Sequence, residues 1–307
     1  MNHDPSLTAS SFSAPRPSDL VGVIARVDDY LTRFLDHQHL PPNLDAAIRY
    51  SLLGGGKRVR PALAWFSAIA CGGCGEASLP AGSAIEMVHA FSLIHDDLPA
   101  MDDDDMRRGR PTLHRHTNEA MAILAGDAML SLAYEAVLTH PEPAIALHLC
   151  QELGLGTRRM IEGQVYDTLG GMPGSLSEIE CVELIHRNKT GALLRASCRM
   201  GAISAGASEA ALDAITRYSE AIGLQFQIID DLLDVEGCSQ ALGKATGKDQ
   251  AAGKKTYPGV LGVDQSKLLA NQLGKAAGDA LGELQAMSLG DTTHLRAMGE
   301  MLTNRSA

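Results

Sequence analysis

Acidic side chains are concentrated in one short stretch of the chain, His95–Arg110. It holds six aspartates and three arginines, and it directly follows the largely apolar residues 91–94. Asp96 and Asp97 are therefore predicted to lie at the edge of the core, where a carboxylate needs a partner. Crowded carboxylates raise one another's pKa unless a cation lies between them. The pattern favours a metal site over the alternative, a solvated acidic loop followed by a basic one.

The residue types in this stretch indicate which metal it would hold. Pro99 should turn the chain after a helix and bring Asp102 back beside Asp96. Hard oxygen ligands without His or Cys favour magnesium over zinc. Arg107 and Arg108 follow directly, and guanidinium groups suit the remaining oxygens of a phosphate. The stretch thus predicts a site for a magnesium-bound phosphate.

A second acidic motif lies in Gln227–Asp234. Asp230 and Asp234 are four residues apart and share one helix face, with Gln227 on the same side. Like charges at that spacing destabilise an isolated helix, and a divalent ion would compensate. A DDxxD motif alone equally suits an exposed acidic face, but two such motifs, each embedded in an apolar helix, favour metal binding.

Cationic residues follow glycines or stand in pairs elsewhere. Gly54–Pro61 reads GGGKRVRP, in which glycines let backbone N–H groups approach an anion while Lys57 and Arg60 supply charge. It is not a P-loop, since GxxxxGK[ST] is absent. Taken alone, it reads better as a basic turn at a helix start. The pairs Lys189-Thr190, Gly243-Lys244 and Lys254-Lys255 are surface lysines unless the fold brings them to the aspartates.

The elements that must position these residues are helices almost throughout. Apolar residues recur at 3.6-residue spacing, and no alternating strand pattern exceeds four or five residues. We expect Ser177 and Glu180 to form a capping box and Ser266 to cap a helix. The prediction is an all-α, single-domain bundle of about ten or more helices. The predicted helices cover residues 20–35, 43–53, 62–70, 79–97, 117–139, 144–169, 178–205, 208–235, 266–287 and 292–303.

Composition bounds the remaining possibilities. The 307 residues carry a net charge of −11, which argues against general nucleic-acid binding. No apolar run approaches the length that spans a bilayer, and residues 1–18 read as a disordered leader rather than a secretory signal. A cytoplasmic location is expected. The six cysteines do not form a disulfide framework. Cys71 and Cys74 have the spacing of one half of a zinc site, but no second pair lies at zinc-finger spacing, and they better suit a glycine-rich turn.

Together these motifs resemble the trans-isoprenyl diphosphate synthases in order and spacing. The resemblance rests on GGGKRVRP, HDDLPAMDDDDMRRGRPTLH, the Lys-Thr pair and FQIIDDLLD followed by GK. It covers roughly residues 20–305. It implies the isoprenoid synthase fold, a helical bundle around a central cavity, as a polyprenyl synthetase domain over 19–307. It also implies a homodimer, with the two aspartate-rich motifs facing each other across the cavity.

The resemblance assigns a role to each motif residue. Three Mg²⁺ ions would hold an allylic diphosphate through Asp96, Asp102 and Asp230, and Asp97, Asp231 and Asp234 would ligate through water or give support. The same diphosphate would contact Arg107, Lys189 and Lys244. Isopentenyl diphosphate would bind Lys57, Arg60, His89 and Arg108. Thr190 and Gln227 would line the reacting carbons, with Phe226 beside the homoallylic unit. Asp103, Asp104 and Asp105 extend the motif and receive no ligand role.

The implied reaction is ionisation, condensation and elimination, with the leaving diphosphate removing the final proton. Metal ions and cations would stabilise the departing diphosphate, and the apolar cavity would keep water from the allylic cation. Phe91 lies five residues before Asp96, where a bulky aromatic is similar to the cavity floor of C15-producing members. Farnesyl diphosphate is therefore the expected product, although the small Ser92 leaves a C20 product open.

Other classes fit less well. A terpene cyclase would carry an NSE-type second motif and would not need the glycine-rich cationic segment. A non-catalytic regulatory homologue would be expected to lack one aspartate-rich motif, and both are present. A purely structural acidic protein would not explain the ordered cationic segments.

Overall fold

The computed structural model describes residues 20–240 and 255–303, without the side chains of 236–240. The predicted leader at 1–18, the Gly243-Lys244 pair and Lys254 lie outside the described residues.

The described chain confirms the all-α prediction. Helices account for nearly every element, and the exception is a two-stranded antiparallel hairpin of β1 (Met106–Arg107) and β2 (Arg110–Pro111). The elements include a short 3₁₀ turn, η3 (Gly75–Ser78), and a π-helical turn, η4 (Arg187–Gly191). The α-helices are α1 (Leu20–Asp36), α2 (Pro42–Leu52), α3 (Val59–Ala70), α4 (Leu79–Asp96), α5 (Leu113–His116), α6 (Glu119–Leu138), α7 (Pro143–Leu169), α8 (Glu178–His186), α9 (Ala192–Ser204), α10 (Glu209–Gln240), α12 (Tyr257–Leu261), α13 (Val263–Ala286) and α14 (Thr293–Thr303).

Helix ends follow the local sequence at some places and tertiary context at others. The capping box is confirmed: Ser177 N donates to Glu180 Oε2 at 2.8 Å, and the Ser177 hydroxyl accepts from Glu180 N. The predicted cap by Ser266 is wrong, because α13 begins after Gly262, whose φ of 81° suits glycine. Ser266 lies in the first turn instead, where its hydroxyl donates to Gly262 O at 2.8 Å.

The helix predicted over 178–205 is interrupted. α8 ends at His186, η4 follows with π-helical geometry, and α9 resumes at Ala192. A π turn inserts one residue into the helical path and often occurs at functional sites. Here it holds Lys189 and Thr190.

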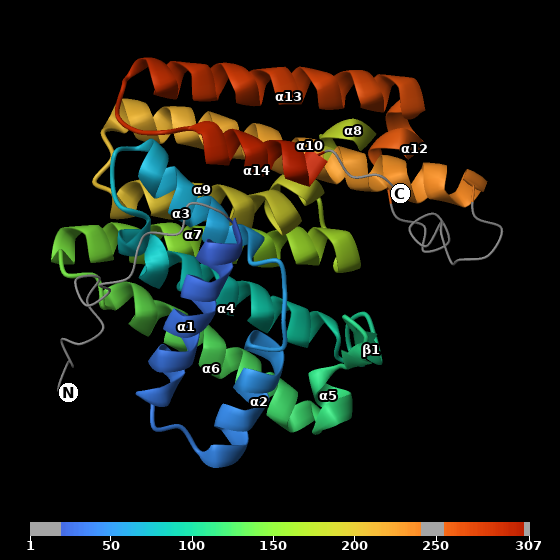
Figure 1. The fold of residues 1–307 in the computed structure, drawn as a ribbon. Helices are drawn as coiled ribbons and strands as arrows, with labels where there is room; N and C mark the ends of the chain where they lie inside the picture. Colours follow the sequence, from blue (N-terminus) through green and yellow to red (C-terminus); the bar gives the residue numbers. More distant parts are fainter. Residues whose placement is uncertain (1–19, 241–254, 304–307) are drawn as a thin grey trace.

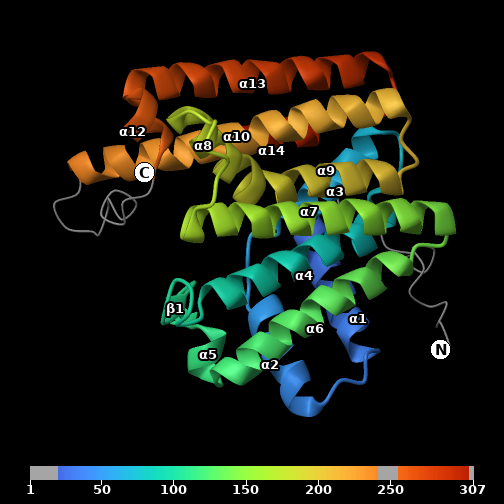
Figure 2. The same ribbon diagram turned by 180° about the vertical axis from the view of Figure 1, so that it is seen from behind.

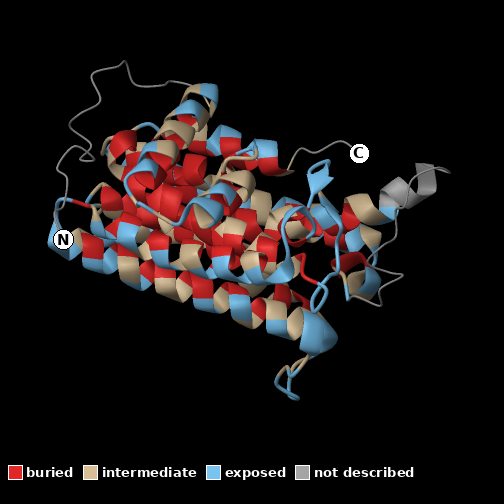
Figure 3. Cartoon of the chain, turned by 90° about the horizontal axis from the view of Figure 1, so that it is seen from below, coloured by how far each residue is buried: buried red, intermediate tan, exposed pale blue. Residues whose placement is uncertain are grey.

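The long helices are stacked in succession, so that sequence-distant residues meet. α13 packs on α10, α10 and α7 pack on α9, and α4 packs on α6. Both ribbon views place the hairpin, α8 and α12 at the same end of the bundle (Figures 1 and 2). Buried residues follow the inner faces of the helices (Figure 3). The candidate chemistry therefore gathers at one end of a shared core.

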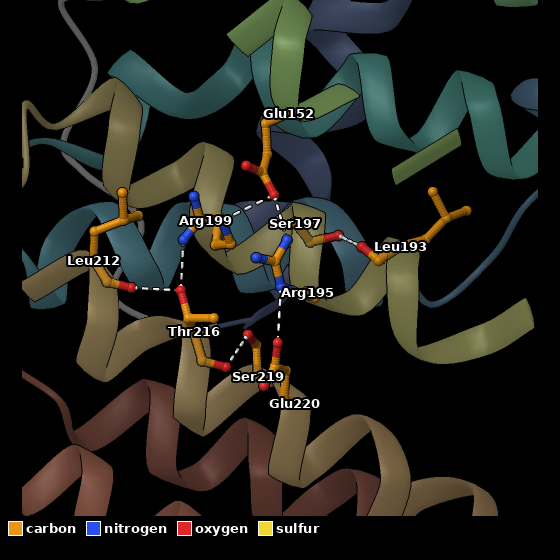
Figure 4. Close-up of polar contacts among 9 residues, drawn as sticks. All are labelled: Glu152, Leu193, Arg195, Ser197, Arg199, Leu212, Thr216, Ser219 and Glu220. Atoms are coloured by element: carbon orange, nitrogen blue, oxygen red, sulfur yellow. Dashed lines mark hydrogen bonds and ion pairs between the residues drawn. The ribbon is translucent and has the colours of Figure 1, made fainter. Parts of the chain in front are cut away.

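A buried carboxylate ties three of the central helices together. Glu152 of α7 accepts from Arg195 Nη1 at 2.8 Å and lies 2.9 Å from Arg199 Nε, both on α9 (Figure 4). Arg195 also donates to Glu220 of α10, and Arg199 to Thr216 of the same helix. A buried charge of this kind requires partners, and here it fixes α9 between its neighbours.

Two helical segments, Gly75–Asp96 and Glu119–Leu138, are long and apolar enough to cross a membrane by length and composition. The expectation that no apolar run reaches this length was therefore wrong. The first of these segments is largely buried within the bundle. The second, α6, has an exposed apolar face that is considered below.

The Cys71–Cys74 stretch forms a turn at the end of α3. Cys71 is buried, which raises the pKa of its thiol to about 12, and Cys74 Sγ donates to Glu76 Oε2 at 2.7 Å. Among the described residues no group of three or more His, Cys, Asp or Glu is placed to hold a metal ion.

Candidate active site

The first aspartate-rich motif forms a tight turn at the end of α4. As predicted, the chain turns after Pro99, and Asp102 N donates to Asp96 O at 2.8 Å. The pKa of Asp96 is raised to about 6, chiefly by burial and further by Asp102 and Asp97, while Lys189 and Arg107 oppose the rise. A carboxylate whose charge is this poorly compensated is well suited to a cation.

Asp97 points to a different partner. Its buried carboxylate accepts from Arg107 Nε at 2.7 and 2.9 Å, and Arg107 Nη2 lies 2.6 Å away. Burial raises the pKa of Asp97, and Arg107 opposes that rise. Arg107 comes from β1, so this bidentate pair fixes the hairpin against the end of α4. Asp97 thus supports the hairpin. Its carboxylate pairs with the guanidinium of Arg107, the residue predicted to hold the diphosphate.

The second motif presents its aspartates differently along α10. Asp230 is exposed and Asp234 is half-buried. Asp231 is only 3% exposed, and its carboxylate accepts from Tyr257 N at 3.0 Å. Gln227 Nε2 contacts the other oxygen of Asp231 at 3.4 Å. Asp231 therefore faces α12. Gln227, predicted to lie on the side of Asp230 and Asp234, has its side-chain amide within hydrogen-bond distance of Asp231.

The π turn places Lys189 between α7 and the first motif. Lys189 Nζ donates to Asp167 Oδ2 at 2.6 Å, and its charge lowers the pKa of Asp96. The close approach depends on Gly163 of α7, where a Cβ would meet Lys189 N at 2.1 Å. Thr190 is half-buried beside it.

Sequence reasoning missed two polar residues of α7 in this region. Asp167 pairs with Lys189, and Gln164 Nε2 is buried without a hydrogen-bond partner in the described part of the chain. The available signal was Gly163-Gln164-x-x-Asp167, in which two polar groups three residues apart follow a glycine on one helix face. That pattern is common on exposed helices and pointed to no particular chemistry.

A cationic pocket lies beside the acidic turn. His89, Arg107, Arg108 and Arg110 contribute to its lining, together with Arg58. Burial, followed by Arg60 and Arg108, lowers the pKa of His89 well below its usual value. Positive charge gathered this densely around a neutral imidazole is suited to an anion.

Of the cations in the GGGKRVRP segment, Arg58 lines the pocket, whereas Arg60 and Lys57 are not among its lining residues. Arg58 is buried and donates to Asp28 at 2.8 Å and Glu86 at 2.9 Å, so it anchors the segment. Arg60 Nε is buried and makes no hydrogen bond with any described residue, and burial lowers the pKa of Arg60. An unpartnered buried guanidinium N–H fits a ligand anion. Lys57 is exposed and does not line the pocket.

The two predicted aromatic residues lie in or against the core. Phe91 is 7% exposed and packs edge-on against His95 with ring centroids 5.2 Å apart. Phe226 is half-buried and packs against the main hydrophobic core. Both side chains thus pack within the helical bundle.

The donor set fits magnesium bound together with a diphosphate. The described carboxylates do not assemble a complete metal cage by themselves. Magnesium in phosphate-transfer sites is typically held by one or two carboxylates with substrate oxygens and water completing the octahedron. Asp96, Asp102 and Asp230 are the residues that would provide those carboxylates.

The raised pKa of Asp96 predicts a pH dependence of stability without metal. Its folded pKa of about 6 exceeds the ordinary value of 3.8, so wild-type stability should fall as pH rises through this window. Asp96→Asn should remove that loss and be more stable at pH 8 by about 1–2 kcal/mol, allowing for partial exposure. Urea unfolding at pH 4 and pH 8 with chelator tests this. Equal stability of the two proteins at pH 8 would contradict it.

Comparisons with known proteins identify the family of the chain. The polyprenyl synthetase family profile matches residues 41–287, inside the predicted domain of 19–307. Farnesyl diphosphate synthase of Escherichia coli K12 is 40% identical over 300 residues, covering 94% of this chain and 99% of the relative. Geranylgeranyl pyrophosphate synthase 7 of Arabidopsis thaliana, a chloroplastic protein, is 46% identical over 238 residues, covering 76% of this chain and 69% of the relative.

A solved structure supports the same fold. The Zymomonas mobilis FPP/GFPP synthase superposes with a TM-score of 0.78 at 32% identity, covering 92% of this chain and 97% of that one. These similar proteins carry names with different product lengths.

Proposed function

The chain belongs to the polyprenyl synthetase family, and from this we propose that it is a magnesium-dependent prenyltransferase producing farnesyl diphosphate. Its substrates would be isopentenyl diphosphate and the allylic dimethylallyl or geranyl diphosphate. One observation carries the proposal: a cationic pocket containing His89 and Arg108 adjoins the acidic turn of Asp96 and Asp102. The two features suit one metal-free diphosphate and one metal-bound diphosphate.

The residues of the chain divide the work of the reaction. Asp96, Asp102 and Asp230 would hold three magnesium ions, which supply positive charge to the departing diphosphate. Lys189 would add a cation at the same group, oriented by Asp167. Arg60 and Arg108 would hold isopentenyl diphosphate with its double bond toward the allylic carbon. Holding the two substrates side by side would favour their condensation. The leaving diphosphate would accept the proton, so no protein base would be needed.

Product length is proposed from Phe91. Its buried ring lies on α4 about one and a half turns before Asp96. An aromatic ring there would stop a growing chain at C15. The alternative is a C20 product, which the name of the plant relative favours and the small Ser92 leaves open.

Phe91→Ala is expected to lengthen the product. Removing the ring opens space below the diphosphate site, so at least half of the alcohol recovered after phosphatase treatment should be C20 or longer. Ser92→Ala is the matched control, since it exchanges one small residue for another at the next position, and its product should stay unchanged. Mass spectrometry of the alcohols measures both. An unaltered spectrum for Phe91→Ala would show that Phe91 is not the floor.

A homodimer is proposed from the surface of α6 and α7. Large apolar side chains there are 42–80% exposed. They are grouped on two neighbouring helices, whereas the apolar residues of an ordinary monomer surface are exposed singly. A second copy of the chain would cover them, as the resemblance implies. The exposed apolar residues are Ile123, Leu124, Leu138, Leu147, Ile161, Val165 and Leu169.

The cytoplasmic location stays a prediction.

The test of the proposed function is a product assay with the purified protein. With magnesium, isopentenyl diphosphate and dimethylallyl diphosphate, a dominant C15 product should form and vanish on chelation. C20 would keep the reaction class and replace the product. Failure to condense isopentenyl diphosphate with dimethylallyl or geranyl diphosphate would favour a regulatory homologue or a cyclase.

A further inference from the structure

One buried carboxylate joins three elements next to the candidate active site. Asp231 of α10 accepts from the Tyr257 amide at the start of α12, and its same oxygen lies 3.3 Å from His186 Nε2 at the end of α8. At that distance the imidazole is within ion-pair range without being aligned for a hydrogen bond. We call Asp231, His186 and Tyr257 the Asp231 joint.

The joint is packed as well as polar. The rings of His186 and Tyr257 stack with centroids 5.5 Å apart at 18°. Tyr257 is fully buried, and a small second core formed by residues of α8, α10, α12 and α13 surrounds it. The Tyr257 hydroxyl makes no hydrogen bond with any described residue, so it is the ring and the amide of Tyr257 that hold the joint.

The position of the joint in the chain gives it a functional meaning. His186 is the last residue of α8, and the π turn with Lys189 and Thr190 begins immediately after it. Asp231 lies between Asp230 and Asp234 along α10. The 3.3 Å contact therefore connects the end of α8, which leads into the turn that carries Lys189, with α10, which carries Asp230 and Asp234.

We propose that Asp231 and His186 are positioning residues that set Lys189 relative to Asp230. Asp231 then acts through His186 and Tyr257 rather than as a metal ligand, although it belongs to the DDxxD motif. The inference rests on the proposed function for its catalytic consequence, but the joint itself is independent of it. A diphosphate held from both sides requires the two walls at a fixed separation, and an ångström-scale shift weakens that hold.

His186→Phe tests the joint most directly. Phenylalanine preserves the ring stack on Tyr257 and removes the nitrogen facing Asp231. Hydrogen–deuterium exchange without metal or substrate should become about tenfold faster in residues 187–191 and 257–261, because both segments lose a shared anchor. The KM for the allylic diphosphate should rise about tenfold, while that for isopentenyl diphosphate stays within about twofold.

Tyr257→Phe is the matched control, since it removes an unpartnered hydroxyl and keeps the ring and amide. It should match wild type in exchange and in both KM values. Asp231→Asn is the second variant: it keeps an oxygen for the Tyr257 amide but loses the charge beside His186. It should shift the same quantities in the same direction by a smaller factor.

Each outcome decides between the claims. Wild-type exchange in His186→Phe, or an equal rise in both KM values, would overturn the joint as a positioning device. If Asp231→Asn abolished metal binding while leaving exchange unchanged, Asp231 would be a ligand and the proposal would be wrong. If wild type showed no condensation, the proposed function would fail, and the exchange measurements would still decide the joint.

Discussion

Asp96→Asn is expected to lower kcat by about a thousandfold or more while the protein remains folded. The substitution keeps the size and shape of a side chain that lies at the end of α4 beside Asp102. It removes the negative charge that would hold a magnesium ion against the diphosphate. Steady-state turnover at saturating magnesium and substrates measures the effect. The same variant should be more stable than wild type without metal, since the raised pKa of Asp96 reflects a charge the fold disfavours.

Asp103→Asn provides the matched control for that loss. Asp103 is exposed and has a φ of 51°, a conformation that asparagine adopts as readily as aspartate. It belongs to the same acidic run but has no proposed ligand role, so its turnover should stay within about twofold of wild type. Equal losses in the two variants would mean that general negative charge, rather than a ligand at Asp96, is required.

Gly163→Ala is expected to cause the second large effect, by displacing the π turn. A Cβ at this position would lie 2.1 Å from Lys189 N, 2.6 Å from Lys189 Cα and 2.7 Å from the Asn188 carbonyl carbon. These are backbone atoms, which cannot rotate away as a flexible side chain can. We expect a loss of stability of about 3 kcal/mol and, because Lys189 moves with its backbone, a fall in turnover of about a hundredfold. Urea unfolding and steady-state kinetics measure the two effects.

Gly282→Ala is the control for the Gly163 prediction. Gly282 also lies inside a helix, α13, but a Cβ there would meet no atom within 4 Å. Alanine should stabilise that helix by about 0.5–1 kcal/mol and leave turnover unchanged. If Gly163→Ala behaved like Gly282→Ala, the close packing of α7 against the π turn at Gly163 would be contradicted.

The sequence predicted those features that depend on neighbouring residues. Helical periodicity located most helices within a few residues, and the Ser177–Glu180 capping box formed as expected. The return of Asp102 to Asp96 followed from a proline placed after an apolar helix. In each case the determining residues lie close together in the chain.

Features that depend on contacts between distant segments were not predictable. The π turn at 187–191 packs against Gly163, which precedes it by more than twenty residues. The different environments of Asp96 and Asp97, adjacent in sequence, arise because Arg107 returns on the hairpin to form its close bidentate pair with Asp97 rather than with Asp96. Likewise Asp231 differs from Asp230 because Tyr257 packs beside it. The resemblance already assigned Asp97 and Asp231 to ligation through water or to support, but the partners that separate them from Asp96 and Asp230 lie far away in the chain.

The most direct test of the site is a crystal structure with Mn²⁺, isopentenyl diphosphate and a non-ionisable allylic diphosphate analogue. Anomalous scattering locates the metal ions independently of the protein. The account predicts peaks beside Asp96 and Asp102 and beside Asp230, bridged by the allylic diphosphate, with the isopentenyl diphosphate next to Arg60. A bound allylic diphosphate without metal at Asp96 or Asp230, or metal at Asp103–Asp105 only, would contradict it.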